Sequence, residues 1–135
     1  MTIESKSVVA QMPTQQLYTF LSDFNNFSHL VPQDKVQNFS CTADRCSFSV
    51  GGFMQLTLAY VERIPFSRVV VAPAADASSP IPFRLIIDLK PEDALSTRVH
   101  VMFDMEGGNP MMNMMLKPKL QEAANKLAEG FANMR

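Results

Sequence analysis

The sequence predicts an α+β fold in which a curved antiparallel sheet of about seven strands wraps around a long C-terminal helix. Six segments between Val36 and Asp104 have the alternating or β-rich character of strands and are separated by short turns. Two short helical segments precede them, between Met12 and Pro32. One long amphipathic helix begins at Pro110, and its apolar stripe has to be buried against the concave side of the sheet.

Length and composition are those of one ordinary domain. The chain has 135 residues, so we expect residues 1–135 to form a single domain. Hydrophobic residues make up 47% and charged residues only 19%, which favours a buried core and argues against disorder. Twelve basic residues face thirteen acidic ones, and this balance gives no electrostatic argument for nucleic acid or for an anionic membrane surface.

The N-terminal segment does not have the pattern of a signal peptide. Residues 1–11 contain no apolar stretch of the kind that a signal peptide has. No apolar run in the chain approaches the ~20 residues that a transmembrane helix needs. We therefore expect a cytoplasmic protein with no integral membrane segment.

The first strand is expected from Thr2 to Met12, where Ile3 and Val8 are β-forming residues among polar ones. A helix should follow at once. Pro13 suits the first turn of a helix, and Thr14 is the expected N-cap.

This first helix has one apolar face, at spacings of three, one and three residues: Leu17, Phe20, Leu21 and Phe24. Asp23 is expected to cap or pair locally where the helix ends. A second short helical turn carries Phe27 and Leu30 and ends before Pro32, because the residue before a proline avoids the helical conformation.

The sheet begins with a hairpin about Ala43-Asp44, and Gly51-Gly52 makes the next turn. Pro91-Glu92-Asp93 is expected to be the last turn. The expected strands are residues 36–42, 45–50, 54–61, 68–72, 83–90 and 98–104.

Alternation in the last two strands predicts which side chains face inward. On this register Arg84, Asp88, Arg98 and Asp104 face outward. A register error of one residue would turn the first three inward, where they would form a polar group able to bind an anion or orient a carbonyl. Both alternatives stay open.

The C-terminal helix should start at Pro110 with Asn109 as its cap and could run to Met134, about 36 Å. Pro118 lies inside it and should kink it near residues 114–116. Its apolar stripe is Met112, Met115, Leu116, Leu120, Ala123, Ala124, Leu127 and Phe131.

The order of these elements matches the helix-grip fold, β-α-α-β6-α. Met12-Pro13, the segment Leu17–Asp23, Cys46–Phe48 before Gly51-Gly52, and the helix start Asn109–Met112 carry the resemblance. The chain resembles the START-like (SRPBCC) superfamily over essentially its whole length. That superfamily includes birch-type pollen allergens, polyketide cyclases and lipid-transfer domains. The chain is especially similar to small bacterial proteins described as polyketide cyclase or dehydratase-like.

The resemblance implies a ligand between the C-terminal helix, the second short helix and the concave sheet. Phe24, Phe27 and Leu30 would form one wall of that site. The floor would be Leu56, Leu58, Phe83, Leu85, Val99, Val101 and Phe103. The lid would be Met112, Met115, Leu116 and Leu120, and methionine side chains adapt to ligands of varied shape.

Residues with reactive side chains are few. Cys41 and Cys46 face each other across the hairpin, so a disulfide is possible, but a reducing cytoplasm favours a reduced pair. His29 lies beside the expected ligand site, whereas His100 should point away from it. Two cysteines with no nearby histidine do not make a zinc site, and no nucleophile motif is present.

Three functions stay open on these residues. We favour binding or carriage of an apolar or amphipathic small molecule, such as a lipid, isoprenoid or aromatic compound, in an internal cavity. A cyclase- or dehydratase-type enzyme could use the same cavity, although no inward acid–base pair is identified. An interaction module with a filled core could pair through the surface of residues 111–115. We expect no cofactor, a hydrophobic small molecule as partner, and a monomer or homodimer.

Overall fold

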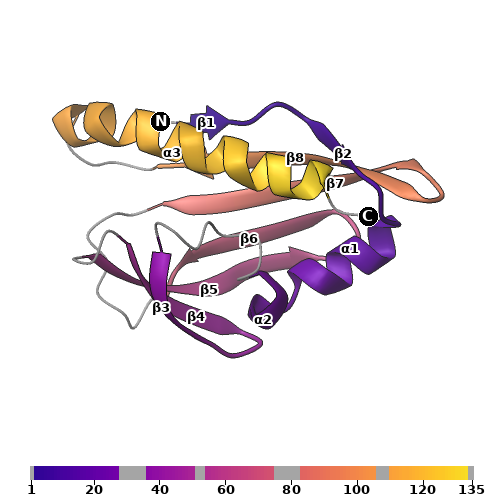
Figure 1. Cartoon of the computed structure of the whole chain (residues 1–135), viewed down its shortest axis with the longest axis horizontal. Helices are drawn as coiled ribbons and strands as arrows, with labels where there is room; N and C mark the ends of the chain where they lie inside the picture. Colours follow the sequence, from indigo (N-terminus) through magenta and orange to yellow (C-terminus); the bar gives the residue numbers. More distant parts are fainter. Residues whose placement is uncertain (1, 28–35, 51–53, 75–82, 106–109, 134–135) are drawn as a thin grey trace.

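Figure 1 shows the computed structural model, in which a curved antiparallel sheet carries a long helix along one side and two short helices at one end. The structure describes residues 2–27, 36–50, 54–74, 83–105 and 110–133. None of the helices within these ranges is both long and apolar enough to cross a membrane. In chain order the elements are β1 (Thr2–Glu4), β2 (Val8–Ala10), α1 (Thr14–Leu21), α2 (Phe24–Phe27), β3 (Val36–Cys41), β4 (Arg45–Val50), β5 (Met54–Ile64), β6 (Arg68–Pro73), β7 (Arg84–Asp93), β8 (Ser96–Asp104) and α3 (Pro110–Ala132).

The sheet has the order β1-β8-β7-β6-β5-β4-β3, and β2 also pairs with β8. All of these pairs are antiparallel. The six predicted strands from β3 to β8 are therefore confirmed as a meander.

The expectation of one unbroken strand from residue 2 to residue 12 is wrong. Two short strands, β1 and β2, both pair with β8 and are separated by Ser5, Lys6 and Ser7. The backbone N–H of Ser5 donates to the Val101 carbonyl at 2.9 Å, and its Oγ accepts from the Val101 N–H at 3.2 Å. At the break, the buried Ser5 therefore satisfies both backbone hydrogen-bonding groups of Val101 on β8.

The predicted alternation of β7 and β8 is confirmed. Their buried side chains alternate with more exposed ones, and Arg84 is exposed on the outer face. On that outer face Asp88 accepts a 2.6 Å hydrogen bond from Arg68 Nε, and Arg98 donates to Glu92 at 2.9 Å. The alternative in which Arg84, Asp88 and Arg98 turn inward as a polar group is therefore wrong.

The turn between β7 and β8 lies directly after the three residues predicted for it. Strand β7 continues through Pro91, opposite Thr97, and ends at Asp93. The turn is at Ala94-Leu95, where Asp93 Oδ1 accepts the Leu95 N–H at 2.8 Å. Proline lacks only a donor, and an exposed hairpin end tolerates that loss.

Helix α1 begins at Thr14, which is its first residue and not its N-cap. Pro13 occupies the cap position without a side-chain hydrogen bond. The Thr14 hydroxyl is instead 2.9 Å from the hydroxyl of Thr97, which also donates to the Met12 carbonyl at 2.8 Å. Thr97 is fully buried, so these bonds satisfy a polar group of β8 and fix the start of α1 on it.

Helix α3 packs against β8, β2 and β1, the strands at one edge of the sheet (Figure 1). It continues as one helix through Pro118, which has no N–H to donate to the preceding turn, and it ends at Ala132 within the described residues. The side chains that face the core come from its second half: Leu120 and Ala123 in part, then Ala124, Leu127, Ala128 and Phe131.

Met115 does not lie on this buried face. Its side chain is 68% exposed, so the expectation that it faces the sheet is wrong. Met115 follows Met111 by four residues, and both point away from the sheet on one helical face. The expected cap Asn109 lies outside the described residues.

Candidate ligand-binding site

The predicted floor residues that the structure describes lie together on the concave face of the sheet. Leu56, Leu58, Leu85, Val99, Val101 and Phe103 are buried and belong to one hydrophobic cluster. Phe83 is half-buried against it, with its ring 6.0 Å from that of Phe103 between centroids. The packing predicted from strand alternation is therefore confirmed, while contact with a ligand stays a prediction.

The predicted wall and lid are described only in part. Phe24 is 1% exposed and joins the same cluster, and Leu120 packs against it in part. Leu30 lies outside the described residues, as do the side chains of Phe27, Met112 and Leu116.

Buried side chains of the concave face come from every strand from β4 to β8. The fully buried side chains come from β6, β7 and β8: Val69, Val71, Ile87, Val99 and Val101, each 0% exposed. The other buried side chains are 3% exposed for Cys46, 7% for Leu58, 8% for Leu56 and 9% for Phe48 on β4 and β5, and 4% for Leu85, 6% for Leu89 and 6% for Phe103 on β7 and β8. Helix α3 packs against β8, β2 and β1, at the edge of the sheet opposite to β4 and β3.

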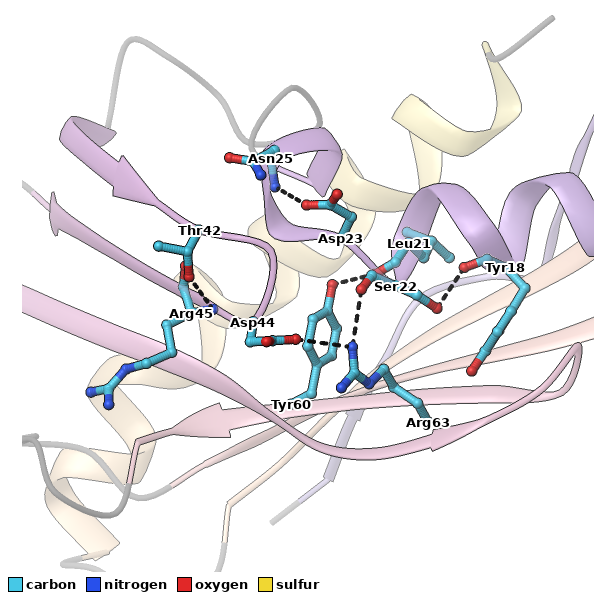
Figure 2. Close-up of polar contacts among 10 residues, drawn as sticks. All are labelled: Tyr18, Leu21, Ser22, Asp23, Asn25, Thr42, Asp44, Arg45, Tyr60 and Arg63. Atoms are coloured by element: carbon cyan, nitrogen blue, oxygen red, sulfur yellow. Dashed lines mark hydrogen bonds and ion pairs between the residues drawn. The ribbon is translucent and has the colours of Figure 1, made fainter.

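Tyr60 is the aromatic residue at which α1, α2 and β5 meet. Its ring stacks on Phe24 with centroids 4.4 Å apart and planes 28° apart. Its hydroxyl donates a 2.5 Å hydrogen bond to the carbonyl of Leu21, the last residue of α1 (Figure 2). The last carbonyls of a helix have no partner within the helix, so Tyr60 satisfies one of them from β5.

Arg63 completes this C-terminal cap of α1. Its Nη1 donates to the Ser22 carbonyl at 3.2 Å and to Asp44 at 3.4 Å, and its guanidinium lies 4.5 Å from the centre of the Tyr60 ring (Figure 2). A cation at a helix C-terminus is also favoured by the helix dipole.

A bulge in β5 brings Tyr60 and Arg63 to the same face. The pairing shifts between Tyr60, which is opposite Val71, and Glu62, which is opposite Val70. Residues three apart in a regular strand point to opposite faces, but the extra residue Val61 turns Arg63 back to the side of Tyr60. Tyr60 could have been found from the sequence because it continues the alternation of Leu56 and Leu58, whereas nothing in the sequence signalled the bulge.

The turn of the β3–β4 hairpin contacts the start of α2. The backbone N–H of Phe24 donates to the Ala43 carbonyl at 3.1 Å, and Asp44 in the same turn meets Arg63. Asp23 accepts the N–H of Asn25 at 2.9 Å, which confirms its expected local capping role (Figure 2). These contacts fix Phe24 over Tyr60.

Cys41 and Cys46 close the same hairpin. They are paired across β3 and β4 as predicted, and a disulfide joins them. The expectation of a reduced pair is therefore wrong for this structure. Disulfides persist chiefly in oxidising compartments, so a cytoplasmic location stays a prediction.

Burial raises the pKa of Tyr60 above its ordinary value of 10.0, while the nearby positive charge of Arg63 acts in the opposite direction. In the unfolded chain this phenol has a pKa near 10.0. Above that pH the unfolded state has lost a proton that the folded state still keeps. The stabilising contribution of neutral Tyr60 is therefore fully present below that pH and is lost as the pH rises above it.

We expect the free energy of unfolding, measured by urea denaturation, to fall more steeply between about pH 9 and about pH 11 in the wild type than in Tyr60→Phe. At neutral pH Tyr60→Phe should lose about 1–2 kcal/mol, because the Leu21 carbonyl loses its donor. Tyr18→Phe is the matched control and should retain the alkaline fall. Parallel pH profiles for the wild type and Tyr60→Phe would contradict the assignment.

The chemistry that these side chains can perform is limited. The Tyr60 hydroxyl is a neutral donor already bound to Leu21. His100 points away from the concave face, as predicted, and its Nε2 is 3.8 Å from Glu4. The expected candidate base His29 lies outside the described residues. No three potential metal ligands come together within the described part of the chain.

Comparison with known proteins identifies the fold. No family model and no curated protein matches the chain. A protein from Thermobifida fusca, solved by NMR, is 20% identical over 99% of this chain and 96% of its own length, with a TM-score of 0.63. A START superfamily protein from Mycobacterium smegmatis is 14% identical over 97% of this chain and 94% of its own, with a TM-score of 0.72.

The chain has the START-like helix-grip fold. The sequence resemblance is thereby confirmed at the level of the fold. The same START-like fold occurs in the di-domain ARO/CYC protein BexL of the BE-7585A biosynthetic pathway. BexL is 12% identical over 96% of this chain and 46% of its own length, with a TM-score of 0.65.

Proposed function

We propose that the protein binds an apolar or amphipathic small molecule between α3, α2 and the concave face of the sheet. The observation that carries the proposal is that the apolar concave face extends well beyond the strands against which α3 packs. Its side chains are apolar from Phe48 on β4 to Phe103 on β8, whereas the main contacts of α3 are with β8, β2 and β1. Apolar surface that the helix does not cover is the surface against which an apolar ligand would gain from the hydrophobic effect.

The START-like fold supports the same proposal, because the helix leaves part of a curved sheet for other groups to cover. Helix α3 packs against β8, β2 and β1. The stacked pair Phe24 and Tyr60 borders the remaining part, and α2 is held there by the Ala43 carbonyl. The proposed ligand would lie against Phe48, Leu56 and Leu58, bordered by that aromatic pair.

A cyclase- or dehydratase-type activity is the alternative that fold likeness to BexL suggests. It needs a proton donor or acceptor at the reacting group. On the described concave face the hydroxyl of Tyr60 is a donor, and it is committed to Leu21. Binding is therefore the better-supported function.

The test is a titration with the apolar dye ANS, followed by displacement with a long-chain fatty acid. The native protein should bind about one dye molecule, and the fatty acid should release it. Leu56→Phe should weaken dye binding about tenfold, because the larger ring takes up space beside Phe48 and Leu58. Leu95→Phe is the matched control, since Leu95 is 72% exposed in the β7–β8 turn, and it should bind the dye like the wild type.

The contrary results are equally definite. If the native protein leaves ANS fluorescence unchanged, the concave face is filled by the protein itself. If Leu56→Phe and Leu95→Phe bind the dye as the wild type does, the dye lies elsewhere and the site is wrongly placed.

A further inference from the structure

Helix α3 begins with an exposed apolar surface that the ligand site does not use. Met111, Met114 and Met115 are 71%, 77% and 68% exposed, and we call them the methionine patch. Their spacing of three and four residues places them on one helical face. The buried residues Leu127 and Phe131 belong to the opposite side of the helix.

The first turns of α3 are unusual for an exposed helix start. The segment 110–116 contains no charged residue, and four of its seven residues are methionine. Acidic residues are favoured in the first turn because of the helix dipole, yet this helix has none there. In Figure 1 these turns extend beyond β1. Exposed apolar surface of this kind is typical of an interaction site.

The charges next to the methionine patch indicate its partner. Lys117 and Lys119 follow the patch, are both exposed, and fall on its two flanks at helical spacing. The segment 110–121 contains no acidic residue. Further along the helix, by contrast, Lys126 is paired with Glu122 at 3.1 Å. The apolar end of α3 therefore carries uncompensated positive charge in its own sequence.

We propose that the methionine patch, with Lys117 and Lys119, docks on the surface of an anionic lipid bilayer. Apolar side chains can enter the boundary of the acyl chains while flanking lysines reach the negative headgroups. Each lysine near such a surface strengthens binding by about fivefold. The overall charge of −1 does not oppose this, because the attraction depends on the local charge within a Debye length.

A second copy of this chain is the less suitable occupant. In a two-fold symmetric dimer the methionine patch would meet itself, so Lys117 and Lys119 of one copy would approach those of the other. The segment 110–121 offers no carboxylate to separate them. An anionic bilayer supplies the negative charge that a second copy lacks.

The test is cosedimentation of the full chain with vesicles, without added ligand. One set is phosphatidylcholine alone, and the other contains about 30% phosphatidylglycerol. The wild type should bind the anionic vesicles at least about tenfold more strongly, and added salt should weaken that binding. Lys117→Gln combined with Lys119→Gln should remove this preference.

Two further variants separate the patch from general apolar exposure. Met114→Asp combined with Met115→Asp should lower binding to anionic vesicles by at least about tenfold. Leu95→Asp makes the same kind of change at an exposed residue of the β7–β8 turn and should bind as the wild type does. All of the substituted side chains are exposed, so thermal unfolding should show folded proteins.

The proposal fails if the wild type does not sediment with anionic vesicles, or if the methionine variant binds as well as Leu95→Asp. It also fails if sedimentation equilibrium shows a dimer that the methionine variant dissociates, since the patch then covers a second copy. None of these results bears on the ligand site, because the dye titration measures that site on its own.

Discussion

Phe131→Ala should lower the free energy of unfolding by about 3–5 kcal/mol, which is a large share of the stability of a domain of this size. Phe131 is 0% exposed near the end of α3 and belongs to the same hydrophobic cluster as Ala128 and Val99. Truncation removes its burial and leaves a cavity that a packed core closes only in part. Urea denaturation of both proteins measures the difference.

Met114→Ala is the control on the same helix. Met114 is 77% exposed, so its truncation should change the free energy of unfolding by no more than about 0.5 kcal/mol. A loss below about 1 kcal/mol for Phe131→Ala would mean that the second half of α3 does not anchor the helix on the sheet. The helix-grip arrangement would then lack its main apolar contact.

Ile87→Phe should lower the free energy of unfolding by about 1–3 kcal/mol, whereas Leu56→Phe should lower it by less than about 1 kcal/mol. The two substitutions add the same volume, because isoleucine and leucine are isomers. Ile87 is 0% exposed on β7. Leu56 is 8% exposed on β5, in the part that we assign to a ligand.

The comparison therefore measures where the concave face has room for a larger side chain. Denaturation of each variant with urea, in protein freed of bound apolar molecules, gives the two losses. Equal losses would mean that the sheet is filled evenly from β4 to β8. The proposed site against Phe48 and Leu58 would then have no space for a ligand.

Period-two alternation made the sheet predictable from the sequence. The inward set from Leu85 to Phe103 follows from side-chain alternation alone, because a slip of one residue would expose the whole set. The single domain predicted for residues 1–135 stays a prediction, since likeness of fold does not test it.

Local exceptions to regular pairing could not be predicted. The break at Ser5 and the extension of β7 through Pro91 depend on bonds to distant residues, which propensity does not contain. The bulge at Val61 is also a local exception. Regular alternation would place Arg63 on the face opposite to Tyr60, so the sequence did not indicate that Arg63 belongs to the candidate site. Met115 was misplaced because four of the first six residues of α3 are methionine, so the apolar pattern there does not single out one buried face.

The site is less predictable than the fold for a physical reason. A core residue and a ligand contact are both apolar and inward, so the sequence cannot separate Val99 from Leu56. The difference lies in how completely the rest of the protein covers each one, and that depends on where α3 rests on the sheet.

A native mass spectrum of the protein, purified from its own host without detergent, tests the central claim most directly. We expect a fraction of the protein to carry an added mass of a few hundred daltons that organic solvent extracts, as for a single apolar molecule in a site of this kind. Leu56→Phe should carry less of it than Leu95→Phe. A spectrum showing only the mass of the bare chain in all three proteins, together with no dye binding, would contradict the ligand site.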